Sequence, residues 1–406
     1  MSNKVPQIRF NGYSDDWVQH KLENIFNIID GDRGSNYPHN SDFLENGTNV
    51  FLDTGNVRPS GFLFNTIKYI SDEKDSQLRA GKMEPNDIVM TSRGTLGNIA
   101  WYTGDIVDRY PSVRINSAML ILRNVIPNEV STPFMISILR GNLIDTFMRR
   151  MKVGSAQPHI TKKDFSKTEV SIPSNFKEQE SLGMFFETLD NLIAANQRKL
   201  DLLKEQKKGY LQKMFPQNGS KFPQLRFAGF ADDWEQRKVG ELYKVTRGQV
   251  LATSKTTPEK VGKNQYPVYS SQTKNDGLMG YYSDYLFDTA ITWTTDGANA
   301  GTVNFRPGKF YSTNVNGVLL SADGLANKAM AENLNRSAWK WVSHVGNPKL
   351  MNNVMSQISV MIPVNLSEQE KISEFLMMID NTIALHQRKL DLLKEQKKGF
   401  LQKMFV

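Results

Sequence analysis

The most constraining feature of this chain is a long segment that occurs twice. Residues 197–215 read QRKLDLLKEQKKGYLQKMF, and residues 387–405 read QRKLDLLKEQKKGFLQKMF. The only difference is Tyr210 in the first copy against Phe400 in the second. A chain with two near-identical long segments is predicted to be built as two related halves.

Both copies belong to longer stretches with the periodicity of a helix. Apolar residues recur there at alternating gaps of three and four, which is the heptad pattern of a coiled coil. We therefore predict that the two helices pair as an intramolecular antiparallel coiled coil, a rod of roughly 60 Å. The alternative is two amphipathic helices buried in separate cores. The predicted seam, in which polar residues interrupt both copies at matching places, consists of Phe186, Leu189, Ile193, Asn196, Leu200 and Leu203, together with Leu376, Ile379, Ile383, His386, Leu390 and Leu393.

A second repeat precedes each half. Residues 6–26 read PQIRFNGYSDDWVQHKLENIF, and residues 223–243 read PQLRFAGFADDWEQRKVGELY. The shared Asp-Asp-Trp step is typical of a helix N-cap followed by a helix that carries a packing tryptophan. A catalytic carboxylate pair is the other interpretation, but no histidine or metal-ligand pattern accompanies it.

Two variable, strand-rich regions lie between these repeats. One contains DIVMTSRGTLGNIAWY from Asp87, and the other contains DTAITWTTDGANAGTVNF from Asp288. Each predicts a strand, a loop bounded by two glycines and a second strand. The fold class is therefore α+β, with two globular strand-rich domains separated by two long helices in a pseudo-two-fold repeat. The predicted domains are 1–173, 174–215, 216–363 and 364–406.

Composition places further bounds on the function. The length of 406 residues, with 39% hydrophobic and 23% charged residues, predicts a soluble protein of about two to four domains. The absence of cysteine and of a long apolar run favours a cytoplasmic protein without a membrane span. The net charge of +8 makes a polyanion a reasonable partner.

Motifs for catalysis are missing from the sequence. There is no phosphate-binding loop, no dinucleotide fingerprint and no histidine spacing suited to a metal. A nuclease-like Glu-x-Lys occurs at Glu205 and Lys207, and again at Glu395 and Lys397, but both copies lie on the predicted coiled coil. We interpret them as solvated or seam charges. The sequence thus predicts no catalytic residue, no metal site and no cofactor bound by this chain.

Polar loops with neighbouring aromatic residues remain as candidate binding sites. They are TSRGTLGN (91–98), SAQPHIT (155–161) and YSSQTKNDG (269–277). Asn and Gln can grip adenine edges, and Arg or Lys can grip guanine or a phosphate. Ordinary polar turns are the competing interpretation of any single loop.

In this organisation the chain resembles the specificity subunits of type I restriction–modification systems. The resemblance covers nearly the whole chain. It is carried by the alternation of heads and helices, by the Ile-Pro lead-ins at 172–180 and 362–370, and by the basic motif KLDLLKEQKKG-[YF]-LQKMF. FLDTGNV, YSSQTKNDG and TTDGANAGTV also resemble target-recognition domains of that family.

The resemblance implies a non-catalytic subunit that binds double-stranded DNA. Each head would read one half of a bipartite, asymmetric site, and the coiled coil would set the gap between the halves. Two modification subunits would dock on the helices and methylate adenine with S-adenosylmethionine, while restriction subunits would use ATP and Mg²⁺. By resemblance and chemistry, the predicted DNA-binding residues are Thr91, Ser92, Arg93, Gln157, Ser271, Gln272, Thr273, Lys274, Asn275, Thr294 and Thr295.

Two other functions are compatible with parts of the sequence. A coiled-coil scaffold could use both heads to bind protein partners. A self-sufficient enzyme is the third hypothesis, which the missing motifs disfavour.

Overall fold

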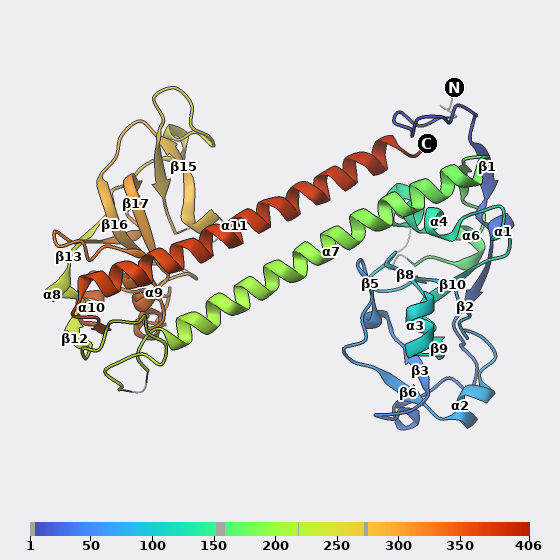
Figure 1. Cartoon of the computed structure of the whole chain (residues 1–406), viewed down its shortest axis with the longest axis horizontal. Coiled ribbons are helices and arrows are strands. Elements are labelled where there is room, and N and C mark those ends of the chain that lie inside the picture. The colour runs from blue at the N-terminus through green and yellow to red at the C-terminus, as the bar shows by residue number, and fades with distance from the viewer. Residues whose placement is uncertain (1–4, 152–158, 218, 272–274) are drawn as a thin grey trace. The chain divides into compact units, whose positions relative to one another are not determined.

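The computed structural model describes residues 5–151, 159–217, 219–271 and 275–406. The chain forms two compact units (Figure 1). Unit 1 consists of 1–198 with 388–406, and unit 2 consists of 199–387. Each unit therefore contains one head and a part of both long helices. This grouping differs from the four predicted segments, because each long helix is divided between the units.

The long helices α7 (Phe176–Lys213) and α11 (Leu366–Lys403) pair in opposite directions within each unit. In unit 1, the ring of Phe185 packs edge-on against Phe400, with centroids 5.2 Å apart. In unit 2, Tyr210 packs in the same manner against Phe375 at 4.9 Å. Both contacts join the C-terminal part of one helix to the N-terminal part of the other, so the predicted antiparallel pairing is confirmed.

The predicted seam is the covered face of both helices. All twelve predicted seam residues are buried or half-buried, and Leu200, Leu376 and Leu390 are almost fully covered. The side-chain amide of Asn196 donates to the Leu192 carbonyl oxygen of its own helix at 2.8 Å. A heptad pattern of apolar residues thus positions the helices, as the sequence indicates.

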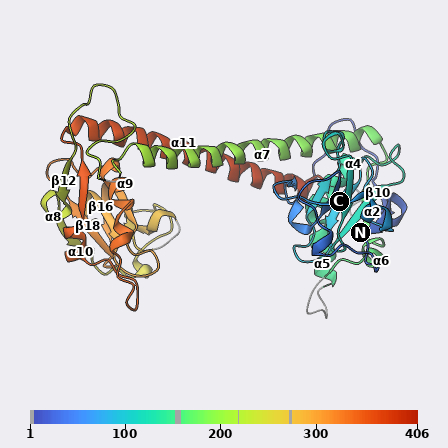
Figure 2. The same cartoon turned by 90° about the horizontal axis from the view of Figure 1, so that it is seen from below.

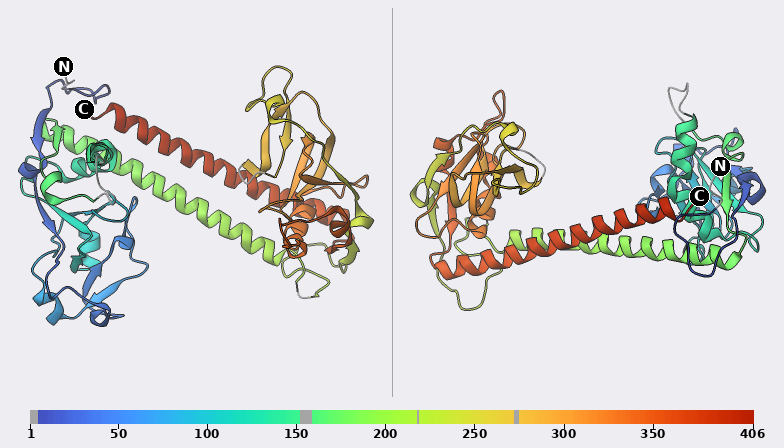
Figure 3. Two further views of the ribbon diagram at one scale, coloured as in Figure 1. Left: turned by 180° about the vertical axis from the view of Figure 1, so that it is seen from behind. Right: turned by 90° about the horizontal axis from the view of Figure 1, so that it is seen from above.

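In each half, one arginine–glutamate ion pair forms the joint between the segment before the head and a long helix. The guanidinium of Arg9 binds the buried carboxylate of Glu178, and Arg226 binds Glu368 in the same way, both with Nε–Oε1 distances of 2.6 Å. Beside the first joint, the Ile8 amide donates to the Lys403 carbonyl oxygen at 2.9 Å, as Leu225 donates to Lys213 in unit 2. The first segment of the chain therefore lies against the end of α11 (Figure 3).

The predicted helix after the Asp-Asp-Trp step is wrong. Trp17 is followed by strand β1 (Val18–Lys21), which pairs antiparallel with β11 (Glu169–Ile172). After Trp234, strand β12 (Glu235–Lys238) pairs in the same register with β19 (Ser359–Ile362). Pairing with a distant strand overrides the local capping signal. The packing role of the tryptophans is confirmed, because Trp17 and Trp234 are buried against Phe405 and Phe215, respectively.

The first head contains several small sheets and short helices. One sheet has the order β2-β10-β7-β8 and another the order β6-β3-β9, with β4 and β5 paired separately. Its strands are β2 (Phe26–Asp30), β3 (Asn49–Leu52), β4 (Val57–Arg58), β5 (Gly61–Phe62), β6 (Lys68–Ile70), β7 (Ile88–Thr91), β8 (Ile99–Trp101), β9 (Ser112–Ile115) and β10 (Met119–Asn124). Its helices are α1 (Leu22–Ile25), α2 (Asp72–Gln77), α3 (Gly104–Arg109), α4 (Thr132–Ile138), α5 (Ile144–Met151) and α6 (Lys162–Phe165).

The second head is built around a larger sheet with the order β13-β18-β16-β17-β14-β15 (Figure 2). Its strands are β13 (Lys244–Arg247), β14 (Tyr266–Tyr269), β15 (Leu278–Tyr282), β16 (Phe287–Thr294), β17 (Val303–Ser312) and β18 (Asn316–Leu320). Its helices are α8 (Val239–Leu242), α9 (Lys328–Asn335) and α10 (Asn352–Gln357).

Candidate nucleic-acid interface

Both heads carry a loop of the same construction at the end of a central strand. In the first head, the Gly97 amide donates to the Thr91 carbonyl oxygen at 2.9 Å. In the second, the Gly301 amide donates to Thr294 at 2.9 Å. Both glycines have positive φ, and a Cβ on Gly301 would lie 2.8 Å from the Val342 side chain. The predicted strand–loop–strand skeleton is thus confirmed in both heads, and glycine is required where the second loop turns back.

The following chain holds each loop at an equivalent place. The Ile160 amide donates to the Ser92 carbonyl oxygen, and the Leu350 amide donates to Thr295, both at 2.9 Å. Ile160 and Leu350 are buried, so they connect each loop to the core of its head. The two loops therefore present different residues from one common frame.

Four of the predicted DNA-binding residues belong to this frame, and three of them, unlike Thr294, do not line a cavity. Thr91, Ser92 and Thr295 are 0%, 1% and 0% exposed. The Thr91 hydroxyl accepts from the Asn98 amide at 2.9 Å, and the Thr295 hydroxyl donates to Asp296 Oδ2 at 2.6 Å. Their burial speaks against direct contact with DNA, although the contact itself stays a prediction. We interpret these three residues as the ones that hold the shape of each loop.

Strands β16 and β17 of the second head form a two-sided hairpin. Ile291, Trp293 and Val303 point into the core. The residues between them on the strands are polar and point the other way, as expected for a period of two. In the antiparallel register Thr292 lies opposite Asn304, and on the other side of β16 Thr294 lies opposite Asn316.

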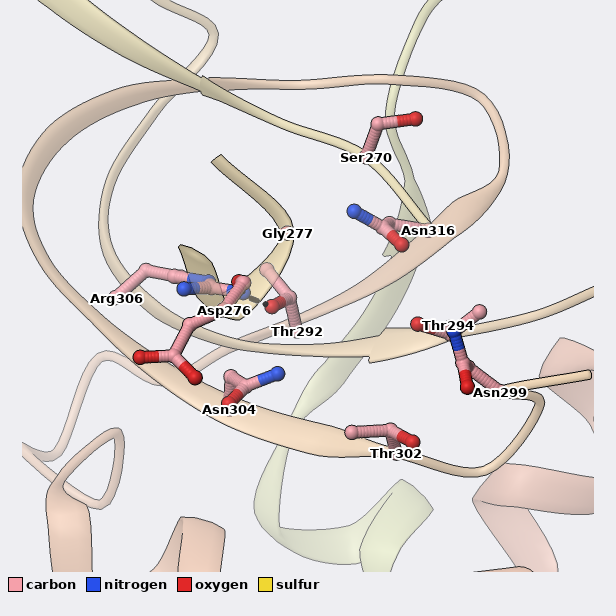
Figure 4. Close-up of a pocket in the computed structure, with 10 residues that line it drawn as sticks. All are labelled: Ser270, Asp276, Gly277, Thr292, Thr294, Asn299, Thr302, Asn304, Arg306 and Asn316. Carbon is pink, nitrogen blue, oxygen red and sulfur yellow. Dashed lines mark hydrogen bonds between the residues drawn. The ribbon is translucent and has the colours of Figure 1, made fainter. Parts of the chain in front are cut away.

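This polar face lines a cavity of about 140 Å³ (Figure 4), the second-head cavity. Hydroxyl and amide side chains surround it, and Ser270, Asp276 and Gly277 complete its wall. Such groups offer both donors and acceptors, which suits the edges of nucleobases. The lining residues are Ser270, Asp276, Gly277, Thr292, Thr294, Asn299, Thr302, Asn304, Arg306 and Asn316.

Arg306 brings a positive charge into the second-head cavity. Its side chain lies 3.7 Å from the ring centroid of Tyr269, and its Nε donates to the Thr292 hydroxyl at 3.2 Å. It also donates to the Asp276 carbonyl oxygen. Burial lowers the pKa of Arg306 below its ordinary value, but a guanidinium stays charged. Arg306 therefore ties the loop before β15 to the polar face of the hairpin.

The predicted loop at 269–277 is only partly described. Gln272, Thr273 and Lys274 lie outside the described residues, as does Gln157 of the first head. Ser271 is half-buried, and its carbonyl oxygen accepts from the Asn299 side chain at 3.3 Å. Asn275 is exposed with φ of +50°, a conformation that asparagine tolerates better than most residues.

The first head carries a basic cavity of about 410 Å³. The predicted residue Arg93 lines it, together with cationic side chains that the sequence did not single out. Of the described residues that line it, Asp30 is the one carboxylate, and it pairs with Arg33 at 3.1 Å. An excess of positive charge favours phosphate groups. The cationic residues are Arg33, Arg93, Lys162 and Lys163, and His159 lies beside them in the wall.

Of the cavity residues that were not predicted, those on β16 and β17 follow a pattern that is visible in the sequence. Alternation of polar and apolar residues in ITWT and VNFR indicates a hairpin with a polar face. Arg33 and Lys162 meet only through the tertiary fold, so no local pattern could predict their cavity. Glu205 and Glu395 are exposed on the helices, which agrees with the interpretation of the Glu-x-Lys motifs.

The described part of the chain supports neither a metal site nor a membrane-spanning helix. Within it, no three His, Asp or Glu residues are grouped in a way that could hold a metal ion. None of its helices combines the length and the apolar character needed to cross a bilayer.

Comparisons with known proteins agree with this geometry. The model of the type I restriction modification DNA specificity domain matches residues 14–205 and 231–395. A Mycoplasma pneumoniae protein named as a type I specificity subunit is 32% identical over 223 residues, covering 54% of this chain and 78% of that protein. The specificity subunit of the type I restriction enzyme MpnII from the same organism is 36% identical over 146 residues, covering 35% of this chain and 43% of that protein.

A solved structure shares the fold. It is the crystal structure of the S subunit of a type I restriction-modification system from M. genitalium. The match has a TM-score of 0.72 at 13% identity and covers 99% of both chains. Since the specificity-domain model matches both halves, this chain belongs to the family of type I restriction–modification specificity subunits, whose role is to recognise the DNA target and which are themselves non-catalytic.

Proposed function

We propose that each head reads one half of a bipartite, asymmetric DNA site. The observation that carries this proposal is the common loop frame, from which the two heads present different cavities. The first-head cavity is basic, whereas the second-head cavity is lined mainly by hydroxyl and amide groups. Two readers of different chemistry in one chain require two different half-sites.

The division of labour follows from the lining of each cavity. Asn299 and Asn304, which are half-buried, can bind base edges, and each good bidentate pair discriminates by about 1–3 kcal/mol. Arg93 and Lys162 of the first head are suited to phosphates, and Arg93 can also bind guanine. The second-head cavity therefore supplies mainly sequence discrimination, while the basic cavity of the first head supplies affinity and position together with a guanine contact through Arg93.

The partners and cofactors form part of the same proposal. Two modification subunits dock on α7 and α11 and flip the target adenines into their own active sites for methylation. S-adenosylmethionine binds to these subunits, and restriction subunits bring ATP and Mg²⁺. The paired helices fix the gap between the half-sites. The chain acts in the compartment that holds the DNA.

Sequencing of methylated adenines tests the reading of two half-sites. The chain is expressed with its modification partners, and the methylated motif is compared between the wild type and Asn299→Ala, Asn304→Ala and Arg93→Ala variants. The two asparagine variants should relax bases in one half of the motif and leave the other half unchanged. Arg93→Ala should weaken methylation or relax the opposite half.

A matched control is Asn353→Ala, because Asn353 is an exposed asparagine of the same unit that does not line the cavity. Relaxation of both halves by one asparagine variant would contradict independent reading by the heads. An unchanged motif in all three variants would remove these cavities from the DNA interface.

A further inference from the structure

Two exposed tryptophans lie two residues apart in one short segment of the second head. Trp339 is 60% exposed and Trp341 is 49% exposed, and Val345 further along is 91% exposed. The other four tryptophans of the chain, at positions 17, 101, 234 and 293, are buried or half-buried. Several large, exposed apolar side chains in one short segment indicate a binding surface.

The segment that carries these residues, 338–349, begins with a 3-10 helix (Ala338–Trp341), and a loop follows this helix. The segment starts at Ala338 and is followed by Leu350, and both of these residues are buried. At its neck, the amides of Ser343 and Lys349 each donate to the carbonyl oxygen of the other, at 2.8 and 3.0 Å. We call residues 338–349 the indole loop.

The indole loop is joined to the wall of the second-head cavity. The Gly297 amide donates to the Pro348 carbonyl oxygen at 3.0 Å, and Gly301 approaches the backbone of Trp339. Asn299, between these glycines, lines the cavity. A molecule seated at the cavity mouth therefore lies next to the indole loop.

Charges around the loop favour a polyanion. Lys340 places its ammonium 5.8 Å from the Trp339 ring, and Lys349 lies on the neck. Arg247 approaches from β13, where Asp296 is its partner at 3.3 Å. Asp296 also pairs with Lys349, at 3.9 Å, so these three cations leave an excess of positive charge, which favours an anionic partner such as DNA over a neutral protein surface.

The indoles themselves are arranged for apolar contact. The Nε1 of Trp339 already donates to the Arg336 carbonyl oxygen at 3.1 Å, so its ring face is what remains for a ligand. Flat aromatic faces pack on nucleobases and on sugars without sequence preference. Apolar side chains are also inserted between base steps where a protein distorts the duplex.

We propose that Trp339 and Trp341 pack on the bases or sugars of the duplex next to the half-site of the second head. This inference rests on the proposed function and adds to it. The indole loop supplies an apolar part of the affinity that does not depend on counterion release. The cations beside it supply the salt-dependent part.

Salt dependence separates these two parts. The full chain with its modification subunits is titrated with a duplex that carries the methylated motif, at several salt concentrations. Trp339→Ala with Trp341→Ala should raise Kd about five- to a hundredfold at every salt concentration, with an unchanged slope of log Kd against log salt. Lys340→Ala with Lys349→Ala should reduce the slope by up to about two.

Two further variants keep the test independent of folding. Trp339→Phe with Trp341→Phe should keep most of the wild-type affinity, because each substitution keeps a flat ring. Phe222→Ala removes an exposed aromatic residue elsewhere in the same unit and should leave Kd unchanged. Circular dichroism and thermal unfolding verify that each variant is folded.

The outcomes distinguish this inference from the function on which it rests. An unchanged Kd in the double alanine variant, with wild-type binding intact, overturns the inference alone. A changed slope of log Kd against log salt in this variant would also overturn it, because the indole loop would then act by positioning charges. Loss of the modification subunits would overturn it too, because the tryptophans would then contact a protein. A wild-type complex that binds no duplex at any salt concentration overturns the proposed function as well.

Discussion

Lys207, a polar residue in the helix seam, connects α7 to a head helix and to α11. Its ammonium lies 2.7 Å from Asp380 of α11 and 3.0 Å from Glu332 of α9. Lys328 of α9 contacts both carboxylates, at 2.7 and 2.8 Å. At the repeat-related place in unit 1, Lys397 pairs with Asp190, which also accepts from Arg140. The seam lysines therefore join each head to its helix pair, in addition to interrupting the apolar stripe.

The charge network around Glu332 predicts a dependence of stability on pH. Burial alone would raise the pKa of Glu332, but Lys328 and Lys207 overcome this effect and hold the pKa below its ordinary value. A carboxylate with a lowered folded pKa contributes stability above its unfolded pKa, and this contribution is lost as the pH falls through the folded pKa. Glu332→Gln should lower the free energy of unfolding at pH 7 by about 3 kcal/mol.

Urea unfolding at pH 7 and at lower pH checks this expectation. The difference between wild type and Glu332→Gln should shrink below about pH 4.3, where unfolded glutamate becomes protonated. Glu374→Gln, at an exposed position on α11, is the matched control and should have little effect. Equal stability of Glu332→Gln and wild type at pH 7 would show that the network is energetically neutral.

At the scale of elements, both long helices expose leucines away from the seam. Leu202 is 52% exposed, and Leu392, its counterpart in the sequence repeat, is 54% exposed. Leu385 and Met378 are further exposed apolar residues on α11 in the unit that contains Leu202. Exposed apolar residues on helices that already have a buried seam favour a further helical partner.

Stoichiometry tests the docking of modification subunits on these residues. Leu202→Glu or Leu392→Glu alone should remove one modification subunit, and the double variant should remove both, because a buried unpaired carboxylate opposes docking. Mass photometry of the purified complexes measures the change. Asn191→Glu and Asn381→Glu occupy matching exposed positions and should retain both subunits. Two bound subunits in the double leucine variant would exclude this face.

The helices could be predicted from sequence because their determinants are local. The heptad spacing of Leu200 and Leu203 names the covered face without any knowledge of the rest of the chain. The strand after Trp17 could not be predicted, because it depends on pairing between Val18 and Ile172. The candidate site falls between these cases. Its loops were found from composition, whereas Arg306 contributes through contacts with Tyr269 and Thr292 that only the folded head supplies.

At the scale of the whole molecule, the proposed role of the helices as a spacer is quantitative. One heptad inserted into both helices, after Arg198 and after Gln387, preserves the seam because its period is seven. Each helix lengthens by about 10 Å, which corresponds to about three base pairs of DNA. Sequencing of methylated adenines should therefore find the same two half-sites with a gap longer by about three base pairs.

The identity of the half-sites is the sharper part of this prediction. The insertions leave every residue of both cavities in place, so the bases that are read should not change while their separation does. A heptad inserted into α7 alone shifts its later residues against α11, so that Lys207 no longer meets Asp380. This single insertion should reduce methylation strongly. An unchanged gap in the doubly extended chain would show that something other than helix length sets the separation of the half-sites. A longer gap between unchanged half-sites would assign the separation to the helices, because the insertions alter only helix length.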